Sequence, residues 1–402
     1  MFTDTAVLLE AAVVASAAVS LAVAPRIVAR GPGQAGRTAR TVGPLAALVA
    51  VTALIFLNQV LFTVYVLRVH GGDPSFVARY LPDGWFALAD GNPALRRLAA
   101  VFPAPELLAP SVLRVQAFLE LPFVLLAFAT VLRWLDPGLY RRVARSPLMW
   151  CAAVSYTVVF CVVEWDLRNP YTTDDLVLRA LSALVTPALI AATAGRAEER
   201  AVRLSAPGLL LFIASLGALG YLVLVVYDTA LLYNLGRLPD RLPGAALAVG
   251  VLVAARQAAA RLPEPAATGT AVAAVGHGLR WWLALFFVPA LAVRYGVTFG
   301  APLLAAGAGV LVAATASVLA VRQALAEAPR GLSATASALL VLRLGCALLA
   351  GLLAAYAAVR WATDTYYEAA LLRALAAFLV TAIGLCAASD AWLRRGEAAQ
   401  SG

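Results

Sequence analysis

The chain has 402 residues, of which 62% are hydrophobic and 13% are charged, and its formal net charge is +9. A soluble domain contains about 25% charged residues, so this composition excludes an ordinary soluble fold and predicts an integral membrane protein. All 31 basic residues are arginines, and most lie in short connections between apolar runs, where they set orientation and do not indicate nucleic-acid binding.

The residue usage also bears on chemistry and origin. The absence of lysine excludes Schiff-base formation, and the abundance of arginine and alanine is typical of a GC-rich bacterial gene. The four cysteines lie singly inside apolar runs, and the chain has two histidines and no metal-binding or Walker-type motif. We therefore expect a protein of the bacterial cytoplasmic membrane without a metal or other cofactor.

Apolar runs long enough to cross a bilayer, about 20 residues each, recur along the whole sequence. The predicted spans are 5–24, 44–67, 112–132, 147–165, 175–194, 207–232, 244–260, 270–293, 299–320, 333–358 and 368–390. The predicted fold is an all-α, polytopic transmembrane helix bundle of about eleven spans, with residues 1–402 forming a single integral membrane domain.

The distribution of arginines predicts the orientation of these spans. Alternate connections, beginning with 25–40, contain 17 arginines, and the opposite set contains 9. Because positive connections stay in the cytoplasm, the N-terminus is predicted outside and the C-terminus in the cytoplasm.

The longest outer connection, 68–111, is predicted to be an extracytoplasmic loop or cap. Its Gly, Pro, Asn and Asp clusters are typical of turns, and the segments 76–80 and 85–88 could form short interfacial helices. A connection of this length that contains apolar residues of its own favours a lid over a tether.

Polar side chains inside or next to the spans are the candidate functional residues, because charge inside a bilayer is costly. The densest group is the outer stretch 164–179, EWDLRNPYTTDDLVLR, which we interpret as the rim of a polar site. The candidate catalytic residues are Glu120, Glu164, Asp166 and Asp228. The candidate substrate-binding residues are Asn58, Gln59, Arg114, Arg179, Arg373, His277, Arg280 and Arg343.

Most of these candidates fall in the predicted outer half of the membrane, which favours a polar cavity open to the outside. Alternatively, residues near helix ends such as Glu164 are simply solvated, and Arg179 pairs locally with Asp175 at i, i+4. Arg343 lies deeper, and it predicts either an anion clamp or a structural salt bridge, for which Glu120 and Asp228 are candidate partners.

Three functions are compatible with this pattern. The first is a membrane enzyme that uses carboxylates and arginines on a lipid-linked or hydrophobic substrate, a peptide included. The second is a proton-coupled secondary transporter or exporter, and the third is a non-catalytic subunit that needs a partner membrane subunit. The thinning of polar groups towards the cytoplasm favours the enzyme, because a transporter needs a route to both faces.

Overall fold

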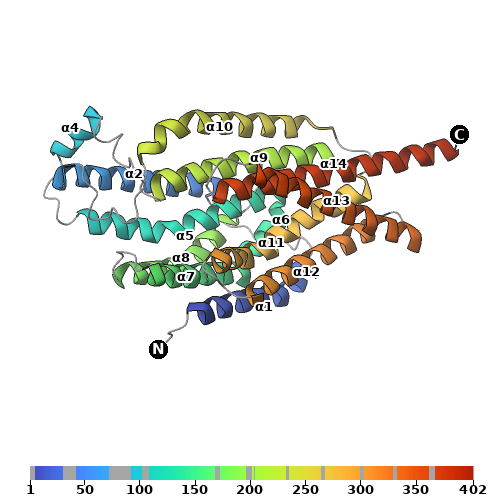
Figure 1. Cartoon of the computed structure of the whole chain (residues 1–402), viewed down its shortest axis with the longest axis horizontal. Helices are drawn as coiled ribbons and strands as arrows, with labels where there is room; N and C mark the ends of the chain where they lie inside the picture. Colours follow the sequence, from blue (N-terminus) through green and yellow to red (C-terminus); the bar gives the residue numbers. More distant parts are fainter. Residues whose placement is uncertain are drawn as a thin grey trace.

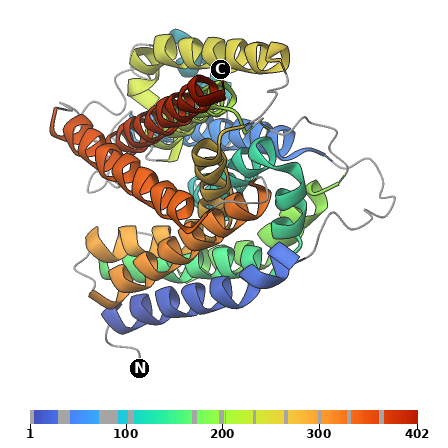
Figure 2. The ribbon, with the colours of Figure 1, turned by 90° about the vertical axis from the view of Figure 1, so that its right-hand side faces the viewer.

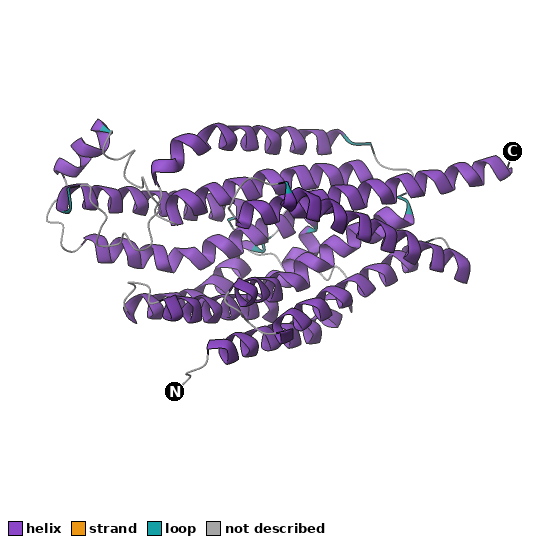
Figure 3. Cartoon of the chain, in the orientation of Figure 1, coloured by secondary structure: helices purple, strands orange, loops and turns teal. Residues whose placement is uncertain are grey.

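The protein was analysed as a computed structural model, which describes residues 5–29, 42–71, 92–101, 108–167, 173–195, 202, 204–231, 235–263, 268–298, 303–328, 333–361 and 367–401. Among these residues the regular structure is helical, without a strand (Figure 3). The α-helices are α1 (Thr5–Ala29), α2 (Pro44–Val69), α4 (Pro93–Val101), α5 (Leu108–Leu135), α6 (Pro137–Ala144), α7 (Pro147–Leu167), α8 (Thr173–Thr193), α9 (Ala206–Val226), α10 (Leu238–Arg261), α11 (Thr270–Thr298), α12 (Leu303–Glu327), α13 (Ala334–Arg360) and α14 (Tyr367–Ser401). A π-helical turn, η3 (Tyr227–Leu231), and a 3₁₀ turn, η4 (Leu235–Arg237), connect α9 to α10.

Each of the eleven apolar runs in the sequence coincides with one of the long helices. Among the described residues, eight helices are long and apolar enough to cross a membrane, and the count is nine if α6 and α7, bent by 67° at their junction, form one span. The all-α, multi-pass architecture is thus as predicted. The eleven-span count and the orientation stay predictions.

Several helix starts follow from local sequence. Asp136 accepts a hydrogen bond from the backbone N–H of Leu139 and precedes Pro137, so α6 begins with both a capping side chain and a favourable proline. The Ser205 hydroxyl accepts from the backbone N–H of Gly208 and caps α9, and the Ser333 hydroxyl accepts from that of Ala336 and caps α13.

The helix α5 occupies the centre of the bundle, and α10 lies at its edge (Figures 1 and 2). The apolar stretch of α5 is 78% buried inside the bundle, whereas the apolar stretch of α10 is 11% buried. The helices α2 and α8 pack on α5, whereas α10 and α14 both pack on α9. The edge helix α10 is therefore held mainly by α9 and leaves most of its surface to its surroundings.

The two ends of the bundle differ. Helix α4 and the start of α5 lie at one end, hereafter the α4 end, and the C-terminus of α14 projects from the other, the C-terminal end (Figure 1). Arg68 Nη1 donates hydrogen bonds to the carbonyl oxygens of Ala99 and Ala100 at 2.6 and 2.8 Å, which ties α4 to α2. The predicted interfacial helices 76–80 and 85–88 lie outside the described residues, and the cap remains a prediction.

Candidate functional site

Most of the candidate residues lie in one of three places. One group surrounds Glu120 in the bundle core, a second surrounds Asp228 at the end of α9, and a third lies towards the C-terminal end. The first two groups lie on neighbouring elements, because the end of η3 contacts α5.

The first group is a buried ion pair between α5 and α8. Arg179 Nη1 lies 2.6 Å from Glu120 Oε2, and the two residues are 5% and 7% exposed. The Tyr156 hydroxyl donates to Glu120 Oε1 at 3.3 Å. Arg179 therefore pairs across helices with Glu120, whereas the local partner suggested by its spacing, Asp175, has a side chain outside the described residues.

An aromatic surface completes this group. The guanidinium carbon of Arg179 lies 3.9 Å from the ring centroid of Phe160, which is stacked on Tyr156 at 5.9 Å. Arginine on an aromatic face and in contact with a carboxylate is stabilised from both sides. The pair is neutral as a whole, which suits a position without access to water.

The second group is built on the π-helical turn η3. Asp228, 4% exposed, is the second residue of this turn. Arg241 Nε and Nη2 each lie 3.1 Å from Asp228 Oδ2, so one carboxylate oxygen receives two nitrogens from α10. Single π turns occur frequently at functional sites, where they change the direction of a side chain.

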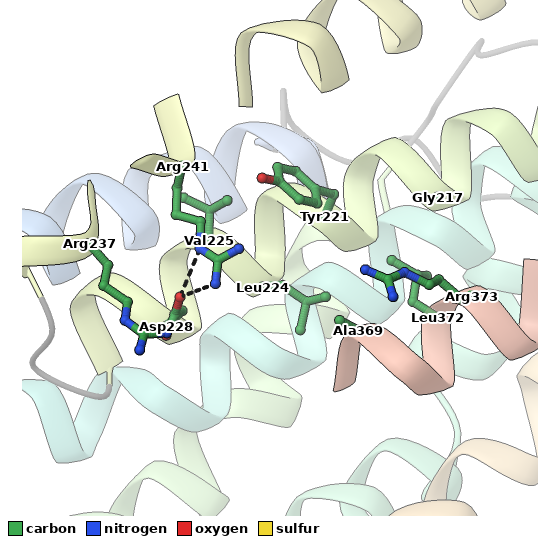
Figure 4. A pocket seen from close by; sticks show the side chains of 10 residues that line it. All are labelled: Gly217, Tyr221, Leu224, Val225, Asp228, Arg237, Arg241, Ala369, Leu372 and Arg373. Carbon is green, nitrogen blue, oxygen red and sulfur yellow. Dashed lines mark hydrogen bonds and ion pairs between the residues drawn. The ribbon is translucent and has the colours of Figure 1, made fainter. Parts of the chain in front are cut away.

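A pocket of about 480 Å³ lies beside Asp228, between α9, α10 and α14 (Figure 4). It is lined by Gly217, Tyr221, Leu224, Val225, Asp228, Arg237, Arg241, Ala369, Leu372 and Arg373. Polar side chains from all three helices meet apolar walls in this pocket. Of the candidates, Asp228 and Arg373 line it.

Gln116 connects the core to the pocket. Its side-chain amide nitrogen lies 3.1 Å from the carbonyl oxygen of Ala230 and 3.5 Å from that of Leu231, at the end of η3. Gln116 lies one turn before Glu120 on the same face of α5. The helix that carries the buried ion pair therefore also supports the turn that carries Asp228.

Two further candidates are buried on α2. Gln59 is 0% exposed and Asn58 is 8% exposed. Both amide atoms of Gln59 and Nδ2 of Asn58 lack a hydrogen-bond partner among the described residues. An unsatisfied buried amide costs about 1–3 kcal/mol, so these side chains mark a polar interior on α2.

The third group consists of ion pairs nearer the C-terminal end. Arg343 on α13 contacts Asp390 on α14 and donates to the hydroxyl of Ser389 at 2.7 Å. Asp390 Oδ2 also accepts from the backbone N–H of Val272, 3.1 Å away at the start of α11. The partner of Arg343 is thus Asp390, and neither Glu120 nor Asp228.

His277 and Arg280 on α11 also have acidic partners. His277 Nε2 lies 2.7 Å from Glu327 Oε2, and Arg280 Nε lies 3.3 Å from Asp136 Oδ2. Buried or half-buried polar groups therefore occur towards both ends of the bundle. The described residues therefore do not support the predicted thinning of polar groups towards the cytoplasm.

The remaining candidates are not brought to either site by described contacts. Glu164 and Asp166 lie near the end of α7, but their side chains are outside the described residues. Arg114 is exposed near the start of α5. Among the described residues, no group of three or more His, Cys, Asp and Glu side chains could hold a metal ion.

Sequence reasoning missed three pocket residues. Arg237 and Arg241 were counted only for orientation, and Tyr221 was included without comment in the predicted span 207–232. The available signal was the i, i+4 spacing of the two arginines soon after Asp228.

The fold defines the class of this chain, which is a multi-pass helical membrane protein. No family model, curated protein or solved structure matches the chain. Its function must therefore be argued from the two sites themselves.

Proposed function

We propose that the chain is an enzyme of the bacterial cytoplasmic membrane that acts on a lipid-linked or other hydrophobic substrate in the pocket between α9, α10 and α14. In this proposal the N-terminus and the α4 end face outwards, so the pocket opens in the outer half of the membrane. The observation that carries the proposal is the buried carboxylate of Asp228, which lines a partly apolar pocket beside Arg241.

Asp228 is the reacting group in this proposal. An ionised carboxylate can take a proton from a substrate hydroxyl or amide and so raise its nucleophilicity, as general bases do. Arg241 both holds this carboxylate in place and offers donors to negative charge that develops on the substrate. The Glu120–Arg179 pair supports α5 and, through Gln116, the turn under Asp228.

The test compares the lipids of bacterial cells that express wild type, Asp228→Asn or an empty vector, by mass spectrometry of extracts. We expect at least one lipid species to change with wild type and to stay at the empty-vector level with Asp228→Asn. The matched control is Asp240→Asn, which makes the same change at an exposed residue of α10 that does not line the pocket.

Equal conversion by wild type and Asp228→Asn would remove Asp228 from the reaction. An unchanged lipid profile in all strains would reject the enzyme and leave the non-catalytic subunit as the better account.

Proton-coupled transport is the second candidate, and one face of α8 favours it. Arg179, Ser182, Thr186 and Thr193 are all buried, and they follow one face of the helix over most of its length. The Ser182 hydroxyl donates to the carbonyl oxygen of Phe118 at 2.8 Å, so this face packs on α5. Polar residues along a helix interface can relay protons, but they also serve as packing contacts.

A flux measurement separates the two candidates. Proteoliposomes that contain a pH-sensitive dye would report proton entry after a pH step. Wild type, Ser182→Ala and the control Ser215→Ala, which removes a half-buried hydroxyl of α9, would be compared. Transport predicts a flux that falls in Ser182→Ala, and the proposed enzyme predicts no flux above empty vesicles.

A further inference from the structure

We infer that the pocket between α9, α10 and α14 binds the phosphate headgroup of a lipid that enters from the bilayer between α10 and α14. This inference rests on the proposed function and deepens it, because it names the substrate class of the same site. It follows from the charge, the shape and the position of the pocket.

The charge of the pocket favours an anion. Three arginines, Arg237, Arg241 and Arg373, line it together with one carboxylate, Asp228, and Arg373 also interacts with a further group. Arg241 is engaged with Asp228, whereas Arg237 makes no ion pair within the described part of the chain. The close-up shows arginine side chains near both ends of the pocket (Figure 4).

Arginine is suited to phosphate in particular. Its planar guanidinium group matches two phosphate oxygens at once, and its hydration is weak enough for a partly buried position. A phosphate that bound to Arg237 and Arg241 would compete with Asp228 for the Arg241 nitrogens. Binding of the headgroup would thus release the carboxylate that we propose as the general base.

The walls of the pocket favour a lipid over a soluble anion. Leu224 and Leu372 form apolar sides, and Gly217 and Asp228 lie eleven residues apart, which corresponds to about 16 Å along the helix. A Cβ added to Gly217 would meet no atom within 4 Å, so this end of the pocket is open space. If the headgroup of a lipid lay at Asp228, the first carbons of the lipid's hydrocarbon chain would therefore have room towards Gly217.

The position of the pocket supplies a route from the bilayer. Helices α10 and α14 each pack on α9 and flank the pocket from its two sides. Only 11% of the apolar stretch of α10 is buried, so this helix borders the surroundings over most of its surface. A lipid can enter along α9 without crossing the core that contains Glu120.

The first experiment measures binding to the full chain in maltoside detergent by isothermal titration calorimetry, with dodecyl phosphate and inorganic phosphate as probes. We expect dodecyl phosphate to bind at least tenfold more tightly than inorganic phosphate. Arg237→Gln should weaken dodecyl phosphate binding about tenfold, because it removes a charge-assisted contact, and Arg373→Gln, at the opposite end of the pocket, should weaken it less, because it removes only a more distant positive charge. Arg261→Gln, at the exposed far end of α10, removes the same charge outside the pocket and should change nothing.

The second experiment uses Gly217→Leu, which fills the open end of the pocket, to test where the alkyl chain of dodecyl phosphate lies. Dodecyl phosphate should lose most of its advantage, and inorganic phosphate should bind as before. Thermal unfolding of each variant shows whether it is folded, and Arg237→Lys, which keeps the charge, should retain part of the affinity if the loss in Arg237→Gln is electrostatic.

The outcomes separate the sources of the phosphate. Equal affinity for the two probes, unaffected by Gly217→Leu, would show a site for a soluble anion. It would overturn the inference that the bound phosphate belongs to a lipid. Affinities that are the same in wild type, Arg237→Gln and Arg373→Gln would overturn the inference entirely.

The outcomes also separate this inference from the proposed function. Asp228→Asn should bind dodecyl phosphate at least as tightly as wild type, because it removes the competitor for Arg241, although it should abolish lipid conversion. Tight binding with unchanged conversion in Asp228→Asn would reject the enzyme proposal alone. Asp228-dependent conversion without dodecyl phosphate binding would reject only the inference that the pocket binds a phosphate headgroup.

Discussion

The side-chain amide nitrogen of Gln116 lies 3.1 Å from the carbonyl oxygen of Ala230, so α5 directly supports the π-helical turn that carries Asp228. The hydrogen-bonding pattern of such a turn, at the end of a helix, leaves carbonyl groups without helical partners. Gln116 satisfies this need from the neighbouring helix. The direction of the Asp228 side chain therefore depends on a residue that does not line the pocket.

Gln116→Leu should release the end of η3 and lower Asp228-dependent lipid conversion about tenfold, because the carboxylate loses its fixed direction. Affinity for dodecyl phosphate should fall less than threefold, since Arg237 and Arg373 remain. The lipid extracts and the calorimetric titration check these two values. Gln257→Leu at an exposed position of α10 is the matched control, and parallel losses in conversion and affinity would mean that Gln116 acts on the pocket as a whole.

Arg179→Gln should destabilise the protein by about 3–5 kcal/mol, because it leaves the carboxylate of Glu120 buried and without its ion partner. The double variant Glu120→Gln, Arg179→Gln should recover more than half of this loss, since two neutral amides can bond to each other. Unfolding in mixed detergent at fixed composition measures both. Additive losses in the double variant would contradict a coupled pair.

Asp390→Asn should lower stability by about 2–4 kcal/mol, because Asp390 both pairs with Arg343 and caps the start of α11. Arg343→Gln should lower it too, and the two effects should be less than additive in the double variant. Neither change should affect dodecyl phosphate binding. A selective loss of binding in Arg343→Gln would restore the anion-clamp hypothesis for this residue.

Gly244→Ala should destabilise the packing of α10 on α9 by about 1–3 kcal/mol, because the added Cβ would overlap the hydroxyl end of Tyr221. The double variant Gly244→Ala, Tyr221→Leu, which also removes the aromatic ring, should restore the packing of α10 on α9. Gly250→Ala on the same helix is the control, since its Cβ would meet no atom within 4 Å. Thermal unfolding would contradict this account if Gly244→Ala and Gly250→Ala shifted the midpoint alike.

The helices were predictable because a bilayer imposes length and hydrophobicity on each span, and both are visible in a single sequence. The run 207–232, for example, corresponds to α9 and η3 with an error of about one residue at each end. The π-helical last turn was not predictable, because its hydrogen-bond partner, Gln116, lies more than a hundred positions earlier in the chain and only the fold brings the two together.

The candidate site was predicted in part. Buried charge is rare in a membrane chain, so Glu120, Asp228 and Arg343 could be recognised from sequence alone. Their partners could not, because Arg179, Arg241 and Asp390 are selected by helix packing and not by spacing. Arg241 in particular resembles any arginine at the end of a span, and only the pocket distinguishes it.

Asp136 illustrates how synthesis and folding of this chain are linked. One of its carboxylate oxygens caps α6, a contact available as soon as that helix exists, whereas the other lies 3.3 Å from Arg280 on α11. Arg280 leaves the ribosome only after 143 further residues have been added between the two positions. The carboxylate of Asp136, at the junction between α5 and α6, therefore lacks its ion partner until α11 has been made, and a chaperone or insertase that shields this junction during biogenesis would raise the yield of correctly assembled protein.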